Sequence, residues 1–319
     1  MINSEIFDPQ EINKAHERIR PYIHQTPVLT SQAIDKIAGC SIHFKCENFQ
    51  KIGAFKMRGA SNAILQLDKT KISAGVVTHS SGNHAQAVAK AAQLIGIPAY
   101  IVMPENAPKV KIAAVKDYGG IVSFCEATLV ARETTSQKII EDKTATFIHP
   151  YDNKDIIIGQ ATAAKELIEE VPQLESILCP VGGGGLLAGT ILSAQFFSNN
   201  CKIYGTEPKG ADDAYQSFKQ RKLIPQISPN TIADGLLTSL GKINYEIIKD
   251  QVSDILLVND REIKEAMRLI WERMKTIIEP SSAVPLAALL RNKALFKDQK
   301  VGIILSGGNV DLKKILSLL

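Results

Sequence analysis

Short apolar runs alternate with longer stretches of helical periodicity through the first half of the chain. Residues 74–79, AGVVTH, have the composition of a buried strand, and residues 83–96 keep small apolar side chains on one helical face. The same order then repeats. The further expected strands are residues 98–104, 121–126 and 145–150, and the further expected helices are residues 110–119 and a segment that ends at 142. This alternation is typical of parallel βαβ units.

A second series of strands and helices occupies the rest of the chain. Upstream, residues 41–47 predict a strand and residues 57–67 a helix. Downstream, the expected strands are residues 176–181, 202–207 and 300–308, and the expected helices are residues 186–197 and 262–276. No internal repeat or low-complexity linker interrupts the pattern. The chain is therefore predicted to have an α/β fold.

Composition excludes several classes of protein. The 319 residues are 45% hydrophobic and 22% charged, with a net charge of +4 that is spread along the chain, as in ordinary globular proteins. Without a basic block, nucleic acid is not expected as a partner. No apolar run approaches the ~20 residues that span a bilayer, and the polar N-terminus is unlike a signal peptide. Five scattered cysteines without CxxC spacing predict reduced thiols in a cytoplasmic protein.

A glycine-rich loop, CPVGGGGLLAG, joins a predicted strand to a predicted helix. Glycines let backbone amides approach an anion closely at a helix N-terminus, so the loop indicates a phosphate site. A tight turn without a ligand is the simpler alternative. Gly183, Gly185 and Ala188 also fit the pattern G-x-G-x-x-A, and Glu207 ends the next strand roughly 20 residues on, as in a dinucleotide site. An NAD-binding oxidoreductase therefore stays open on this segment alone.

The segment KCENFQKIGAFKMRGA places Lys56 in a glycine-flanked turn before a helix. Such a lysine forms a Schiff base with a carbonyl cofactor, or is simply a solvated surface lysine. Together with SSGNHAQ, VGGGGLLAG and the terminal LSGGN, this segment resembles the fold-type II pyridoxal-phosphate (PLP) enzymes, within them the family of serine racemases and serine, threonine and 3-hydroxyaspartate dehydratases. HQTPVLTS, EPKGADDAYQ, TIADG, WERMK and IEPSSAV extend the resemblance over nearly the whole chain.

The resemblance implies a fold of two doubly wound α/β domains, with the smaller inserted in the larger. Residues 1–70 and 152–319 would form the large cofactor-binding domain, and residues 71–151 the small domain that gates the substrate. It also implies a homodimer.

The resemblance further assigns residues to the cofactor. Lys56 would bind the PLP aldehyde, and Phe55 would pack beside the ring. Asn83 would hydrogen-bond the ring hydroxyl, and Ser306 the pyridine nitrogen, where a neutral partner makes the ring a weaker electron sink. The residues that would cradle the phosphate are Gly182, Gly183, Gly184 and Gly185, and those that would line the same cavity are Gly235 and Glu279.

Two successive serines precede Asn83. The amides of this turn suit a substrate carboxylate. The residues that the resemblance assigns to substrate binding are Ser80, Ser81, Asn83, His84 and Arg132. Inverting an α-carbon needs an acid/base group on each of its faces; Lys56 would serve one, and Ser81 resembles the residue that serves the other in serine racemases. Alternatively, Ser81 only caps the helix.

The implied function is racemisation of serine and dehydration of L-serine, or of a related 3-hydroxy amino acid, to a keto acid and ammonia. The alternatives are a threonine or threo-3-hydroxyaspartate dehydratase without significant racemase activity, a β-replacement enzyme, a non-catalytic cofactor-binding protein, and the NAD-binding oxidoreductase. The sequence does not rank the two reactions, because both start with removal of the same proton.

A divalent cation and a nucleotide are also expected. Glu207 and Asp213 offer hard oxygen ligands six residues apart. The resemblance implies a site for Mg²⁺, Ca²⁺ or Mn²⁺ formed by these carboxylates and the carbonyl of Ala211; a solvated acidic loop is the alternative. Gln86, Tyr118 and Asn309 match the region where some relatives bind ATP as an allosteric ligand.

Overall fold

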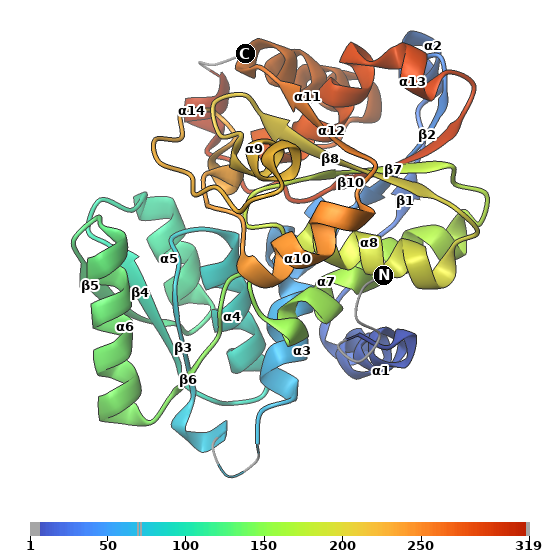
Figure 1. The fold of residues 1–319 in the computed structure, drawn as a ribbon. Coiled ribbons are helices and arrows are strands. Elements are labelled where there is room, and N and C mark those ends of the chain that lie inside the picture. The colour runs from blue at the N-terminus through green and yellow to red at the C-terminus, as the bar shows by residue number, and fades with distance from the viewer. Residues whose placement is uncertain (1–6, 69, 71, 317–319) are drawn as a thin grey trace.

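A computed structural model, which describes residues 7–68, 70 and 72–316, divides the strands between two sheets (Figure 1). The larger sheet has the order β1-β2-β10-β7-β8-β9, with β1 antiparallel to β2 and the other neighbours parallel. Its strands are β1 (Val28–Leu29), β2 (Ser41–Cys46), β7 (Ser176–Pro180), β8 (Lys202–Pro208), β9 (Asp254–Val258) and β10 (Lys300–Leu305). The smaller sheet is parallel throughout, in the order β5-β4-β3-β6. Its strands are β3 (Val76–His79), β4 (Ala99–Pro104), β5 (Ile121–Cys125) and β6 (Thr146–Phe147).

Helices cover both faces of each sheet, as parallel sheets require. On the larger sheet, α1, α7, α8 and α10 share one apolar cluster, and α2, α11 and α12 share another. The α-helices are α1 (Pro9–Ile19), α2 (Gln32–Ala38), α3 (Lys56–Leu65), α4 (Asn83–Leu94), α5 (Lys109–Asp117), α6 (Leu129–Lys143), α7 (Lys154–Glu170), α8 (Gly185–Phe197), α9 (Asp213–Gln220), α10 (Lys242–Gln251), α11 (Asp260–Met274), α12 (Pro280–Arg291), α13 (Lys293–Phe296) and α14 (Leu312–Leu316). The 3₁₀ turns are η1 (Arg20–Tyr22), η2 (Glu47–Phe49), η3 (Lys51–Gly53), η4 (Ile72–Ala74) and η5 (Asp234–Leu236).

Helix α3 connects the two lobes of the molecule (Figure 1). Met57, Ala60 and Ile64 of α3 share an apolar cluster with α4 and with strands of the smaller sheet. The same helix packs against α7 on its other side, where Gly59 and Gly159 let the two backbones approach closely. The first residue of α3 therefore lies where both lobes can influence it.

The predicted strands and helices are observed, with limits that shift by up to three residues, and two of these shifts matter for the site. The strand expected over 145–150 is reduced to β6, Thr146–Phe147, because only these residues pair with β3. The helix expected to begin at residue 57 begins one residue earlier, so Lys56 is the first residue of α3 and not part of the preceding turn.

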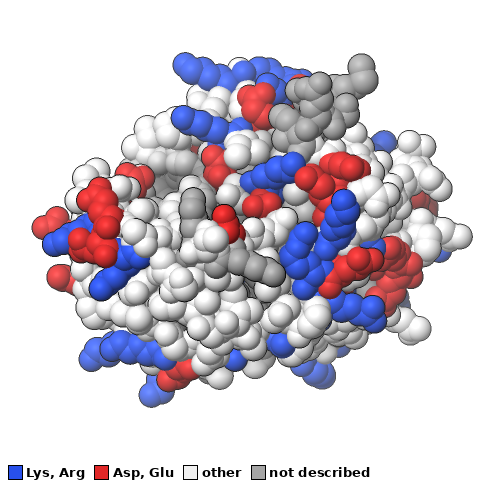
Figure 2. All heavy atoms as spheres, turned by 90° about the horizontal axis from the view of Figure 1, so that it is seen from below, with Lys and Arg blue, Asp and Glu red and all other residues white. Residues whose placement is uncertain are grey.

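Charges are mixed over the surface that Figure 2 shows. On that face, blue and red side chains lie beside one another, and the figure shows no broad area of a single sign among the described residues. Within the same described part of the chain, no helix has both the length and the apolar character needed to cross a membrane.

Candidate active site

Lys56 lies at the centre of the candidate site. Its ammonium donates to the carbonyl oxygen of Pro150 at 2.7 Å and lies 5.2 Å from the centre of the Phe55 ring. Burial lowers the pKa of Lys56 to about 8. At pH 7 about one amine in ten is then neutral, against roughly one in three thousand at the ordinary pKa. The lysine is therefore suited to attack a carbonyl group.

The glycine loop faces Tyr151, which the sequence did not single out. A Cβ on Gly183 would lie 2.3 Å from atoms of the Tyr151 ring, and one on Gly185 would lie 3.1 Å from the Tyr151 carbonyl oxygen. Gly184 caps α8 with a φ of 89°, a left-handed conformation that favours glycine. No side chain caps α8. Its first amides are therefore available to an anion such as a phosphate group.

The Tyr151 ring is held in place by His149. The two rings meet edge to face with their centres 4.9 Å apart, and the Lys56 ammonium lies 6.0 Å from the centre of the Tyr151 ring. The His149 Nδ1 accepts from the backbone amides of Tyr151 and Asp152 at 3.3 and 2.8 Å. Burial lowers the pKa of His149 to about 4. The imidazole is therefore neutral, with its proton on Nε2.

A second group of contacts brings Asn83 to Glu279. The Asn83 amide donates to both carboxyl oxygens of Glu279 at 3.1 Å, and Asn309 donates to the Asn83 oxygen at 2.9 Å. Burial, followed by the charge of Asp234, raises the pKa of Glu279 to about 7. A Cβ on Gly235 would lie 3.7 Å from Glu279. Asn83, Gly235 and Glu279 therefore lie close together.

Ser306 lies between the segment of Lys56 and the segment of Glu279. Its hydroxyl lies 3.0 Å from that of Ser282, and its carbonyl oxygen accepts from the Phe55 amide at 3.0 Å. The next residue, Gly307, lies so close to Glu279 that a Cβ there would be 2.9 Å from a carboxyl oxygen. The structure thus connects the predicted cofactor residues from Lys56 to Ser306 and on to Glu279.

The two serines lie between the end of β3 and the start of α4. The N-cap of α4 is Gly82, and no side chain caps the helix. The Ser80 hydroxyl accepts from the Gly82 amide at 3.3 Å, whereas the Ser81 hydroxyl makes no hydrogen bond with any residue that the structure describes. The alternative that Ser81 caps the helix is therefore wrong, and its half-buried hydroxyl is available for another role.

His84 and Arg132 differ in what they can offer to a substrate. The buried His84 ring lies 3.2 Å from the carbonyl oxygen of Ile148, and burial holds its pKa well below the usual range. Its imidazole therefore contacts the protein backbone and is not offered to a substrate. Arg132, on α6, is half-buried and donates to the Thr128 carbonyl oxygen at 3.3 Å. Burial and then the charge of Arg132 lower the pKa of His79, the last residue of β3 before the two serines.

The predicted metal ligands Glu207 and Asp213 lie close together and are buried. Burial and then the charge of Asp213 raise the pKa of Glu207 well above its usual range, and burial raises that of Asp213 to about 6. Asp213 Oδ2 accepts from the Leu240 amide at 2.7 Å, while Oδ1 is buried without a partner among the described residues. Two paired acids with an unsatisfied oxygen fit a hard cation. The described residues contain no cluster of three or more His, Cys, Asp or Glu that could hold one, so a backbone carbonyl, such as that of Ala211, would have to contribute.

Glu207 does not fit the dinucleotide alternative. Its two carboxyl oxygens accept from the amides of Ala214 and Tyr215 at 3.2 and 2.8 Å, and the side chain is fully buried. A ribose cannot reach it there, although a small ion can use the remaining lone pairs. The buried position of Glu207 therefore excludes a contact with the ribose of NAD.

A cavity of about 290 Å³ has Gln86 and Asn309 in its lining, together with Lys111 and Asp234. Lys111 donates to Asp234 at 2.7 Å. Tyr118 does not line this cavity; its ring lies 5.6 Å from the Lys90 ammonium instead. The structure thus brings together two of the three residues that were expected near a nucleotide.

Comparison with known proteins identifies the family of this chain. Residues 19–307 match the family described as "Pyridoxal-phosphate dependent enzyme". The chain is 51% identical to a serine racemase of Dictyostelium discoideum, covering 97% of each chain, and 45% identical to a β-hydroxyaspartate dehydratase of Paracoccus denitrificans, covering 96% of this chain and 97% of the relative. It superimposes on the structure of maize serine racemase with a TM-score of 0.95 at 46% identity, covering 98% and 97% of the two chains.

The chain therefore belongs to the pyridoxal-phosphate dependent enzymes, and its fold is that of fold-type II members of this class. The family resemblance seen in the sequence is confirmed. The residues at the site fit the cofactor: a lysine with a lowered pKa, a glycine loop that leaves no room for a Cβ, and an uncapped helix N-terminus.

Proposed function

We propose that this enzyme racemises serine and dehydrates L-serine, or a closely related 3-hydroxy amino acid, to a keto acid and ammonia. The observation that carries the proposal is the Ser81 hydroxyl, which is half-buried at the start of α4 and is not used as a helix cap. Serine racemases and hydroxyaspartate dehydratases among the relatives support both reactions.

In this proposal, Lys56 binds the cofactor aldehyde, and the amides of the glycine loop hold the phosphate. Asn83 hydrogen-bonds the ring hydroxyl, Phe55 packs beside the ring, and Ser306 meets the ring nitrogen. Bound PLP supplies an electron-withdrawing ring that makes the α-proton of an amino acid acidic. A neutral hydroxyl at Ser306 leaves that nitrogen largely unprotonated and so moderates the effect.

The substrate carboxylate is proposed to bind the amides at the start of α4, with Arg132 nearby. His84 would contribute its backbone amide, because its imidazole is already bonded to Ile148. The Lys56 amine moves the proton on one face of the α-carbon, and the Ser81 hydroxyl moves it on the other. After the same first step, loss of the 3-hydroxyl and then hydrolysis with release of ammonia would give the keto acid.

Ser81→Ala is expected to lower formation of D-serine from L-serine by about 10²-fold or more, because one of two acid/base groups is lost. Formation of pyruvate should persist, since it needs the proton removed from only one face. The measurement is a chiral assay of D-serine together with pyruvate after incubation in heavy water with PLP and Mg²⁺. Proton NMR during the incubation follows exchange at the α-carbon.

Ser80→Ala is the matched control and should lower both products in proportion, because its hydroxyl accepts from the Gly82 amide and so supports the substrate-binding turn that both reactions would use. Equal losses of D-serine and pyruvate in Ser81→Ala would remove the second-base role. Pyruvate without D-serine from the unmodified enzyme would instead identify a dehydratase, and no turnover of serine would direct the assay to threonine and threo-3-hydroxyaspartate.

We also propose that Glu207, Asp213 and the Ala211 carbonyl bind Mg²⁺, or Ca²⁺ or Mn²⁺ in its place. The folded-state pKa of Asp213, about 6, lies above the value near 4 of an unfolded aspartate, so the folded state holds extra protons between these values. Stability from this group therefore falls as pH rises through 6. Saturating Mg²⁺ should raise the Tm by about 5 °C at pH 7.5, and by clearly less at pH 5, where protons compete.

Asp213→Asn should abolish this shift in a thermal melt, whereas Asp212→Asn, its neighbour, should keep it. A full Mg²⁺ shift in Asp213→Asn would exclude the site. The cation would also support the active site, because Asp213 holds the Leu240 amide and the adjacent Gly241 amide donates to the Gly183 carbonyl at 3.1 Å.

The cavity lined by Gln86, Lys111 and Asn309 is proposed to bind ATP as an allosteric ligand, since it offers a lysine to a phosphate group. Calorimetric titration with ATP tests this site.

We further propose a homodimer in the cytoplasm. The exposed apolar side chains of Phe49 and Ile277 support a subunit interface, and the free cysteines support a reducing compartment. Sedimentation velocity measures the oligomeric state.

The predicted domain limits also remain a proposal. Every strand of the smaller sheet lies between Val76 and Phe147, which supports a small domain over residues 71–151 inserted into a large domain formed by 1–70 and 152–319.

A further inference from the structure

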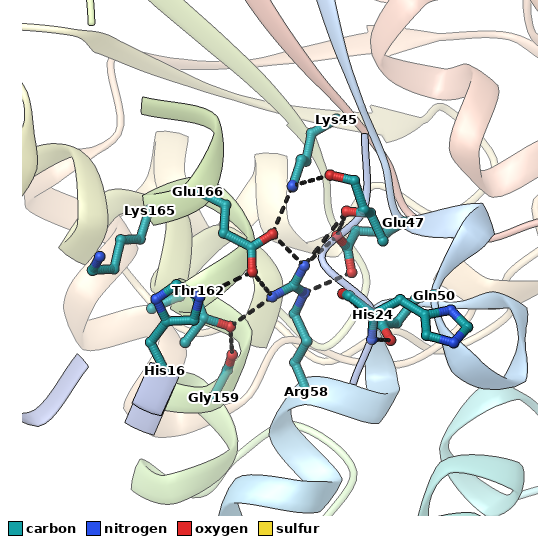
Figure 3. Close-up of polar contacts among 12 residues, drawn as sticks. His16, His24, Lys45, Glu47, Gln50, Arg58, Gly159, Thr162, Lys165 and Glu166 are labelled. Atoms are coloured by element: carbon teal, nitrogen blue, oxygen red, sulfur yellow. Dashed lines mark hydrogen bonds and ion pairs between the residues drawn. The ribbon is translucent and has the colours of Figure 1, made fainter. Parts of the chain in front are cut away.

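A group of ionic side chains lies buried beside the start of α3 (Figure 3). Arg58, on α3, is fully buried and lies between the carboxylates of Glu47 and Glu166. Lys45, also fully buried, contacts Glu166 at 2.6 Å. We call these four residues, Lys45, Glu47, Arg58 and Glu166, the Arg58 cluster.

Every N–H of the Arg58 guanidinium has an acceptor. Nε and Nη2 donate to the two oxygens of Glu47 at 2.7 and 2.8 Å, and Nη1 and Nη2 donate to the two oxygens of Glu166 at 2.7 Å each. The fifth N–H reaches the Thr162 hydroxyl at 3.2 Å. Two bidentate pairs fix the plane of the guanidinium as well as its position. A lysine ammonium cannot reproduce this geometry, because it has three donors at one point.

The charges of the Arg58 cluster balance within the cluster. Two cations face two carboxylates, and burial favours a neutral Glu166 but is outweighed by hydrogen bonds from His16 and Arg58, which hold the pKa of Glu166 well below its usual range. A cluster of this kind is weak evidence for stability, since apolar side chains of similar volume often serve as well or better. Its geometric precision, in contrast, has no apolar substitute.

The cluster holds the first turn of α3 against the large sheet and α7. Glu47 follows β2, and Glu166 and Thr162 lie on α7, so Arg58 is fixed to two separate elements. The adjacent Gly59 amide donates to the Gln160 side chain at 3.1 Å, again on α7. Lys56 lies only two residues before Arg58, at the start of the same turn. Any tilt or shift of this turn moves the Lys56 amine relative to the glycine loop on α8.

We propose that Arg58 is a positioning residue for Lys56: its two bidentate carboxylate pairs fix the first turn of α3, and so the place of the Lys56 amine in the cofactor site. This assignment rests on the proposed role of Lys56 in binding the cofactor aldehyde. It gives the Arg58 cluster a part in forming the lysine–cofactor bond, although within the described residues none of its members hydrogen-bonds to the Lys56 amine.

The test compares two substitutions in the cluster. Arg58→Met/Glu47→Leu removes one cation and one anion, so Lys45 and Glu166 remain balanced and the protein is expected to fold. Arg58→Lys keeps the charge but loses both bidentate pairs. In both variants, the rate at which PLP restores the visible absorbance of the apo-protein should fall at least about tenfold, and kcat should fall as much while KM for serine stays within about threefold. KM is spared because the carboxylate site lies on α4.

The matched control is Arg268→Met/Glu272→Leu, which removes an exposed ion pair of the same residue types on α11 and should change none of these values. The proposal would be overturned if Arg58→Met/Glu47→Leu kept the wild-type reconstitution rate and kcat. Full activity in Arg58→Lys would overturn it as well. Loss of the folded state in both variants, seen by circular dichroism, would assign the cluster to stability and overturn it too. A separate experiment tests the proposed role of Lys56. If Lys56 does not bind the cofactor aldehyde, borohydride reduction will still attach PLP to the Lys56→Ala variant.

Discussion

Lys56→Ala is expected to lower kcat for both racemisation and dehydration by about 10³-fold or more and to abolish covalent attachment of the cofactor. The Lys56 amine is proposed to bind the aldehyde and to move the α-proton. The substitution removes the amine, so both functions are lost. The measurements are kcat, the visible spectrum of the PLP-loaded protein, and mass spectrometry of the peptide that carries PLP after borohydride reduction.

Two comparisons make this result specific to Lys56. Lys36→Ala, which removes an exposed lysine on α2, should leave the spectrum and kcat unchanged. Partial recovery of Lys56→Ala by added methylamine would separate loss of the amine from loss of the fold. A variant that keeps the wild-type spectrum and the reduced adduct would place the cofactor on another lysine, and a protein without any visible band would return attention to other cofactors.

The parts of the site that could be predicted from sequence are those formed by short continuous segments. The glycine loop lies between a strand and a helix, and a phosphate site there is predicted from local backbone geometry. Lys56 and Asn83 likewise begin helices directly after turns. In each case the candidate residues are neighbours in the chain, so the pattern of strand, turn and helix predicts where they lie, while the roles of Lys56 and Asn83 were implied only by the family resemblance.

The parts that could not be predicted depend on contacts between distant segments. Asn83 meets Glu279 and Asn309 across 196 and 226 residues, and Tyr151 covers Gly183 from the loop before α7. Hydrophobic periodicity identifies which face of an element is buried, but not what that face touches. Glu279 was expected in the cavity only through the family resemblance, and its contact with Asn83 required the structure.

The Arg58 cluster was missed for a related reason. In the sequence, Arg58 lies in a helix beside Lys56 and has the appearance of an ordinary solvated arginine. Glu166 lies on α7, which is buried around most of its circumference and so lacks the polar face that marks a surface helix. Only the packing of α3 on α7 shows that the two charges meet in the interior.

Gly183→Ala is expected to weaken PLP binding by about tenfold or more, which corresponds to at least ~1.4 kcal/mol. The added Cβ would lie 2.3 Å from the Tyr151 ring, so either the ring or the glycine loop must move. Movement of the loop would take the amides of α8 away from the proposed phosphate site, and overpacking alone typically costs about 1–3 kcal/mol of stability. Equilibrium titration of the apo-protein with PLP measures the first effect, and the Tm measures the second.

The double variant Gly183→Ala/Tyr151→Ala separates contact with the ring from a direct requirement for glycine. If the Tyr151 ring is the obstacle, the double variant should bind PLP more tightly than Gly183→Ala/Tyr151→Phe, in which the ring remains. Residues in contact are expected to show such non-additive effects. Equal affinities in the two double variants would mean that the phosphate itself, and not Tyr151, excludes a side chain at Gly183, and the tyrosine would then have no part in shaping the loop.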